Sequence, residues 1–198
     1  MEIQIFSSLN ELNESFTEWL KEVGSSGKQI TVALSGGSTP KSLFSYWSSL
    51  PEGEIDWTKI KFFWGDERCV APEDSESNFK MTKEHLFNNI NIPEENIFRI
   101  KGENNPTDEA KRYGKLLNSE LEQQNGTPVF DIVILGMGDD GHTASIFPHE
   151  IELWNNENNC VTATHPESGQ IRVSLTGKVI NAAKNVVFLV TGMNKAEK

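Results

Sequence analysis

Four short apolar runs, each followed at once by glycine and polar residues, most constrain the fold of this chain. The runs are expected as strands at 29–34, 60–64, 129–135 and 186–191, and they lead into SGGSTP, GDER, GMGDDGH and GMNK. Mainly apolar runs of this length are typical of strands that are buried on both faces of a parallel sheet. Because the carboxyl ends of parallel strands meet at one edge, we expect the four polar segments to converge there.

Helical periodicity separates these runs, which predicts a single α/β domain over residues 1–198. Helices are expected over 9–23 (with Gly24 as the stop), after Pro40, and over 79–89, 106–124 and 178–183. A short first strand is expected at 2–6, and two further strands at 161–164 and 171–175 are expected to pair. The fold class is therefore a mainly parallel sheet flanked by helices, with a small additional strand pair.

The composition excludes several classes of partner. The formal net charge is −11, which disfavours binding to nucleic acid or to an anionic membrane, and no run reaches membrane-spanning length. An anionic substrate must therefore meet a local cationic pocket. The first residues lack a signal-peptide pattern, so a cytoplasmic protein is expected. Cys69 and Cys160 lack metal-ligand or CxxC spacing; a disulfide between them stays open, but reduced thiols are the simpler interpretation.

The segment Ser35–Pro40 has the pattern of an anion-binding turn. It joins an apolar strand to a helix, and Ser38 or Thr39 is expected to cap that helix with Pro40 at its first position. Backbone N–H groups and the helix dipole then point at one spot. The alternative is an ordinary strand-to-helix turn. A nucleotide P-loop is excluded, because the Gly-Lys-Ser/Thr ending is absent.

Two other strand ends carry side chains suited to acid–base chemistry. Asp66, Glu67 and Arg68 follow one strand, and Asp140 and His142 follow another. Each group has a plainer interpretation as a solvated turn, but convergence at one sheet edge favours a site. Cys69 has no histidine partner that would make it a nucleophile and is interpreted as structural.

Five blocks, in order, resemble the 6-phosphogluconolactonase family, within the larger group of sugar-phosphate isomerases and deaminases. They are LSGGSTP at 34–40, FFWGDER at 62–68 with SESNF at 75–79, FDIVILGMGDDGHTASIFP at 130–148, RVSLT at 172–176, and TG with Lys195 near the end. The resemblance implies a modified Rossmann-like fold. It also implies hydrolysis of 6-phosphogluconolactone to 6-phosphogluconate in the oxidative pentose phosphate route, without a metal or an organic cofactor.

The resemblance also assigns the site residues. Those expected around the substrate phosphate are Gly36, Gly37, Ser38, Thr39, Arg172 and Lys195. Those expected at the sugar are Asp66, Arg68 and His142, with Asp140 or Asp66 orienting the imidazole or the substrate hydroxyls. A neutral imidazole can deprotonate water near pH 7, and Arg68 or loop N–H groups can stabilise the charge on the lactone carbonyl.

Two rival functions remain at this point. A glucosamine-6-phosphate deaminase is disfavoured by Phe147 before Pro148, where those enzymes carry an acid, and by Arg68, where they carry a tyrosine. A non-catalytic sugar-phosphate sensor would need a DNA-binding segment for which this chain has no room. Family members usually continue through another helix and strand, which this chain is expected to lack, and a monomer or weak homodimer is expected.

Overall fold

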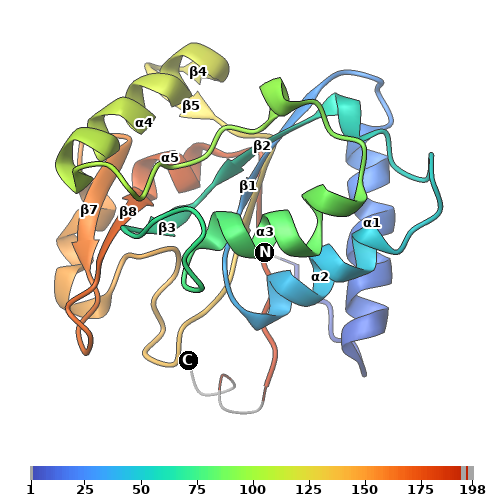
Figure 1. The fold of residues 1–198 in the computed structure, drawn as a ribbon, viewed down its shortest axis with the longest axis horizontal. Helices are drawn as coiled ribbons and strands as arrows, with labels where there is room; N and C mark the ends of the chain where they lie inside the picture. Colours follow the sequence, from blue (N-terminus) through green and yellow to red (C-terminus); the bar gives the residue numbers. More distant parts are fainter. Residues whose placement is uncertain (1, 193–194, 196–198) are drawn as a thin grey trace.

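The central element is a four-stranded parallel sheet, as predicted (Figure 1). The computed structural model describes residues 2–192 and 195. The strands are β1 (Ile30–Leu34), β2 (Ile60–Trp64), β6 (Ile132–Leu135) and β9 (Asn185–Phe188), in the order β2-β1-β6-β9. β1 and β2 pair in register from Ile30 with Ile60 to Leu34 with Trp64, so the two strands end level with each other.

Helices lie on both sides of this sheet, which gives the α/β class that the sequence predicts. They are α1 (Leu9–Gly24), α2 (Ser38–Ser48), α3 (Asn78–His85), α4 (Pro106–Glu120) and α5 (Gly177–Ala182). In Figure 1, α1 to α3 pack together on one side, and α4 and α5 lie on the other. Within the described residues, four 3₁₀ segments complete the helical structure: Trp57–Lys59, Phe87–Asn89, Glu94–Asn96 and Pro148–Asn155.

A second, antiparallel sheet extends the predicted strand pair. β7 (Cys160–Thr164) pairs with β8 (Ile171–Leu175), and β8 also pairs with β3 (Asp66–Arg68). The sequence alone favoured a turn or strand-end segment at 66–68. Its pairing with β8 instead gives these three side chains a fixed strand geometry close to the carboxyl end of β2.

Three predicted elements are wrong or misplaced. The helix predicted to reach residue 124 ends at Glu120, because β4 (Glu122–Gln124) and β5 (Thr127–Val129) form a hairpin. Asn125 and Gly126 both have positive φ (52° and 76°), as the Asn-Gly turn of a hairpin requires. The run at 129–135 consequently splits between β5 and β6. No strand forms at 2–6, where Ile3 and Ile5 are exposed and pair with no sheet edge.

Aromatic packing fixes the ends of the strands that support the site. Phe63 stacks on Phe98 with ring centroids 4.6 Å apart, and both Trp64 and Tyr113 are fully buried. The hydroxyl of Tyr113 on α4 accepts a hydrogen bond from the Trp64 backbone N–H at 2.9 Å and lies 3.2 Å from its carbonyl oxygen. The Trp64 ring packs edge-on against Phe79 and Phe87, so the last residue of β2 is held at both its ring and its backbone.

Candidate active site

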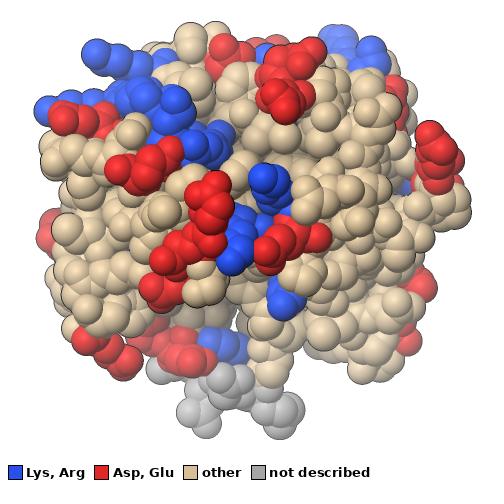
Figure 2. Space-filling model, in the orientation of Figure 1, with Lys and Arg blue, Asp and Glu red and all other residues tan. Residues whose placement is uncertain are grey.

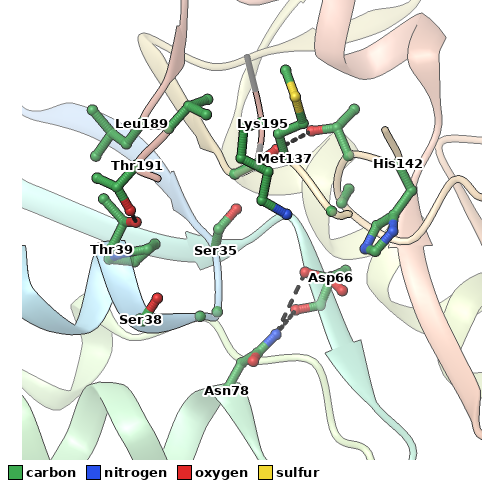
Figure 3. A pocket seen from close by; sticks show the side chains of 18 of the residues that line it. Ser35, Ser38, Thr39, Asp66, Asn78, Met137, His142, Leu189, Thr191 and Lys195 are labelled. Carbon is green, nitrogen blue, oxygen red and sulfur yellow. Dashed lines mark hydrogen bonds between the residues drawn. The ribbon is translucent and has the colours of Figure 1, made fainter. Parts of the chain in front are cut away.

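A cavity of about 250 Å³ opens at the carboxyl edge of the parallel sheet. Residues from all four predicted polar segments line it (Figure 3). They include Gly36, Gly37, Ser38 and Thr39 after β1; Asp66 and Arg68 after β2; Gly138 and His142 after β6; Thr191 and Lys195 after β9; and Arg172 from β8. The predicted convergence is confirmed. Asp140 does not line the cavity but contacts the His142 ring, which does.

The start of α2 faces this cavity with its backbone N–H groups uncapped by a side chain. The N-cap residue is Gly37, whose φ of 107° favours glycine, so the predicted cap at Ser38 or Thr39 is wrong. The Thr39 hydroxyl instead lies 2.8 Å from the hydroxyl of Thr191. A helix N-terminus with free N–H groups and a positive dipole end is suited to bind an anion.

Asn78, which the sequence reasoning did not single out, joins this turn to Asp66. A Cβ at Gly36 would come within 1.9 Å of Asn78 Oδ1, so glycine is needed for the close approach. The Asn78 amide donates to the Asp66 carbonyl oxygen at 3.0 Å and to its Oδ1 at 3.4 Å. The anion-binding turn and the carboxylate are thereby held in one fixed arrangement.

Asp66 is buried and held from three directions. Its Oδ2 accepts a hydrogen bond from the Ser145 hydroxyl at 2.5 Å and lies 4.0 Å from Arg172 Nη1. Ser145 belongs to the same loop as His142, and its backbone N–H donates to the Ser174 hydroxyl at 3.1 Å. Ser145 was not predicted as a site residue either, because nothing in the sequence marks a loop serine as functional before its hydrogen-bond partner is known.

Glu67 has a structural role. Its carboxylate accepts hydrogen bonds from the backbone N–H groups of Arg68, Asn78 and Phe79 and from the Ser77 hydroxyl. It therefore satisfies the start of α3. Burial raises the pKa of Glu67, although these hydrogen bonds act to lower it. Of the two adjacent acids, Asp66 faces the cavity and Glu67 faces the protein.

His142 is held by a turn of its own. Its Nδ1 lies 2.5 Å from Asp140 Oδ1, which also accepts the His142 backbone N–H at 3.1 Å. Although burial acts to raise the pKa of Asp140, these hydrogen bonds lower that pKa below its ordinary value. An ionised carboxylate can only accept, so Nδ1 carries the proton and Nε2 remains an acceptor. The arrangement suits a general base.

The turn also depends on Gly138, one of the three glycines of the segment GMGDDGH. A Cβ at Gly138 would lie 2.1 Å from His142 Nδ1 and 2.8 Å from Asp140 Oδ1. The Gly138 N–H donates to the His142 carbonyl oxygen at 2.8 Å, which closes the turn. The imidazole therefore occupies space that any larger residue at position 138 would fill.

The remaining predicted residues are cations. Lys195 lines the cavity and its ammonium group contacts the Asp139 carboxylate. In Figure 2 the largest group of Lys and Arg side chains lies over α4, away from the carboxyl edge of the sheet. The positive charge inside the cavity therefore comes from Arg68, Arg172 and Lys195 rather than from that surface.

Neither cysteine contributes to the cavity. Both thiols are free, and burial raises the pKa of Cys69 to about 11, so Cys69 is a poor nucleophile near neutral pH. Across residues 2–192 and 195, no three His, Cys, Asp or Glu side chains are grouped as a metal site. None of the helices in that part of the chain is both long and apolar enough to cross a membrane.

Comparison with known proteins defines the class. Residues 7–198 match the family described as glucosamine-6-phosphate isomerases/6-phosphogluconolactonase, and the chain belongs to that family. The chain is 49% identical to 6-phosphogluconolactonase of Treponema pallidum over 168 residues, which cover 85% of this chain and 70% of the relative. It is 51% identical to that of Haemophilus influenzae over 169 residues (85% and 71%).

Solved structures agree on the fold. A crystal structure named devB protein superposes with a TM-score of 0.94 at 46% identity, covering 98% of this chain and 82% of the other. 6-Phosphogluconolactonase from Trypanosoma brucei superposes with a TM-score of 0.85 at 30% identity, covering 97% and 82%. The predicted modified Rossmann-like fold is confirmed.

Proposed function

We propose that this chain hydrolyses 6-phosphogluconolactone to 6-phosphogluconate, the oxidative pentose phosphate step for which its relatives are named. The observation that carries the proposal is that one cavity joins an uncapped helix N-terminus, suited to a phosphate, with a carboxylate-oriented imidazole, suited to activate water. Hydrolysis of a sugar-phosphate lactone needs a group that binds the phosphate and a base that activates water, in the same cavity.

The substrate phosphate is anchored at the turn Gly36–Thr39, with the Lys195 ammonium as counter-charge. Its binding displaces Lys195 from Asp139, because a dianionic phosphate attracts the ammonium group more strongly than one exposed carboxylate does. Asp66, whose oxygens are oriented by Ser145 and Asn78, accepts hydrogen bonds from the sugar hydroxyls.

The reaction runs through His142. Nε2 removes a proton from water as the water oxygen attacks the lactone carbonyl carbon, and the Nδ1 hydrogen bond to Asp140 stabilises the imidazolium that forms. The guanidinium of Arg68 stabilises the charge that develops on the carbonyl oxygen. When the bond to the ring oxygen breaks, the imidazolium returns the proton to that oxygen. No metal takes part in this scheme.

A coupled assay tests the proposal. Formation of 6-phosphogluconate is followed by its oxidation with excess dehydrogenase, and spontaneous lactone opening is subtracted at every pH. We expect activity that survives a chelator. Ammonia release from glucosamine 6-phosphate, without lactone hydrolysis, would instead favour the rival deaminase function and group the chain with the glucosamine-6-phosphate isomerases that the family description also names. Absence of both activities would refute an enzymatic role.

A further inference from the structure

A second cavity, of about 550 Å³, is formed by α4, β7 and the end of the 3₁₀ segment Pro148–Asn155. Among the described residues, it shares no lining residue with the cavity at the carboxyl edge of the parallel sheet. Its volume lies within the range of about 300–1,000 Å³ that is usual for sites of small organic ligands. We call it the α4 groove, because that helix contributes Thr107, Ala110, Lys111, Gly114, Lys115 and Asn118.

One part of the α4 groove is apolar. Ala110, Cys160 and Val161 line it and are buried, and Leu153 lines it and is partly buried. These side chains provide a surface against which the face of a ring can pack. The other lining residues are mostly polar or charged. The groove therefore suits a ligand with an apolar ring at one end and polar groups at the other.

Lysine side chains give the α4 groove a positive charge. Lys111 and Lys115 lie one helical turn apart, and neither ammonium group pairs with a carboxylate in the part of the chain that the structure describes. Like charges at this spacing destabilise a helix. Lys178 of α5 donates to the Glu157 carbonyl oxygen at 3.0 Å, which uses one of its three N–H groups. Three lysines and the acid Glu157 line the groove, so its local charge is +2 in a chain of net charge −11.

Asparagine side chains supply neutral donors and acceptors in the α4 groove. Asn159 Nδ2 donates to Asn118 Oδ1 at 2.8 Å and to the Gly114 carbonyl oxygen at 3.3 Å. Asn158 Nδ2 donates to Asn156 Oδ1 at 3.0 Å. The other amide atom of each of these four asparagines has no partner among the described residues. Amide groups that both donate and accept can bind the edge of a base or the hydroxyls of a ribose.

Gly114, in the middle of α4, leaves space in the groove. Glycine inside a helix is less favourable than alanine, because it loses more backbone entropy on folding. Packing does not require the glycine here, since a Cβ would lie 3.7 Å from Asn159 Cβ and 3.9 Å from Cys160 N, which are ordinary contacts. Its φ is not positive either, so the backbone would accept another residue. The missing side chain therefore widens the groove rather than fitting α4 to its neighbours.

We infer that the α4 groove binds a nucleoside monophosphate, at a site distinct from the proposed active site. Lys111 and Lys115 bind the phosphate, whose negative charge offsets the repulsion between the two ammonium groups. The ring of the base packs against Leu153 and Val161, and the unpaired amide atoms bind its edge or the ribose hydroxyls. A phosphate alone would leave the apolar wall uncovered, and a nucleoside alone would leave the lysines unpaired, so tight binding needs both parts. This inference does not depend on the proposed lactone hydrolysis.

Equilibrium dialysis with isotope-labelled AMP tests the inference, with adenosine and ribose 5-phosphate as competitors. Each competitor lacks one part of AMP, so each should displace the label roughly 10-fold less effectively than unlabelled AMP. Lys111→Gln and Lys115→Gln should each weaken AMP binding by roughly 3- to 10-fold. Lys83→Gln, at an exposed lysine on α3, is the matched control and should bind AMP as the wild type does. The inference is overturned if AMP does not bind at about 1 mM, if ribose 5-phosphate competes as well as AMP, or if neither lysine substitution weakens binding.

Two further variants distinguish the α4 groove from the active-site cavity. Lys195→Ala removes a lysine of that cavity and should leave AMP affinity unchanged. An equal loss of affinity in Lys195→Ala and Lys115→Gln would place AMP in the active-site cavity and overturn the inference. Gly114→Leu fills the groove and should abolish AMP binding while the melting temperature is retained. If this variant melts as the wild type does and binds AMP equally well, the groove is not the site; if it does not fold, the two lysine substitutions decide. Lactone hydrolysis is measured separately, so either proposal can fail without the other.

Discussion

The imidazole Nδ1 of His142 lies 2.5 Å from Oδ1 of Asp140, two residues earlier in the same turn. The carboxylate fixes the tautomer and the direction of the ring, so Nε2 is the proton acceptor that remains for chemistry. Substitutions in this pair should therefore have different effects from substitutions in the groups proposed to bind substrate and in those that stabilise the fold.

Replacing His142 by asparagine removes the imidazole that we propose as the general base. We expect kcat to fall by roughly 10²–10⁴ with little change in KM, because the phosphate anchors the substrate elsewhere. The wild-type rate should decline on the acid side as the imidazole protonates, and the variant should lose that limb of its pH profile. Near-normal kcat with an unchanged profile would transfer the role of base to Asp66.

Asp140→Asn tests whether the carboxylate orients the imidazole of His142. The same variant should also change how the stability of the fold depends on pH. Misdirection of the ring should lower kcat by roughly 10- to 100-fold while KM is retained. Because the pKa of Asp140 is lowered in the folded chain, the ionised carboxylate stabilises the fold above its unfolded pKa of about 4, and this contribution is lost as pH falls through the folded pKa. Thermal melts should therefore show the wild type as the more stable form at pH 6–8, with the difference shrinking below pH 4. A constant difference across that range would contradict the linkage.

Gly138→Ala tests whether the glycine makes room for the imidazole. The added Cβ would lie 2.1 Å from Nδ1, so the ring must move, and we expect a loss of kcat comparable to that of Asp140→Asn. Gly136→Ala in the same loop is the matched control, because its Cβ meets no atom within 4 Å. The control should keep the acid limb of the pH profile. Equal kcat values for the two variants would show that the position of the ring does not limit the reaction.

The sequence predicted the parallel sheet and the edge where the site lies, because those depend on apolar runs and on where they end. It missed what depends on contacts between distant segments. Ser145 and Asn78 acquire a role only once β3 brings Asp66 to them. In the sequence, Ser145 is an ordinary loop serine, and Asn78 lies next to the start of a predicted helix. The hairpin at 122–129 was missed although Asn125-Gly126 marks it, because the preceding helical periodicity was extended too far. The strand expected at 2–6 does not form, because alternation of apolar and polar residues does not by itself provide a neighbouring strand with which to pair.

Glu67→Gln should damage the fold rather than the chemistry. Each carboxylate oxygen accepts two hydrogen bonds, so in either orientation the new amide nitrogen faces two donors. We expect a loss of about 1–3 kcal/mol in the free energy of unfolding, measured by chemical denaturation. Glu73→Gln, at an exposed acid in the loop between β3 and α3, is the control and should lie within about 0.5 kcal/mol of the wild type. A stable Glu67→Gln protein that had lost its activity would reassign Glu67 to the reaction.

Lys195→Ala tests the phosphate subsite. The ammonium group lines the cavity, and in the proposed complex its loss removes one charge-assisted contact to the phosphate of about 1.5–3 kcal/mol. KM for the lactone should therefore rise by roughly 10- to 100-fold while kcat changes little, since the groups that move the proton are untouched. Inorganic phosphate should inhibit the wild type competitively and the variant more weakly. Lys184→Ala, which removes a lysine paired with Asp131 outside the cavity, controls for the change in net charge. If KM and phosphate inhibition are the same in Lys195→Ala as in the wild type, Lys195 does not contact the phosphate, and the start of α2 must bind that group without it.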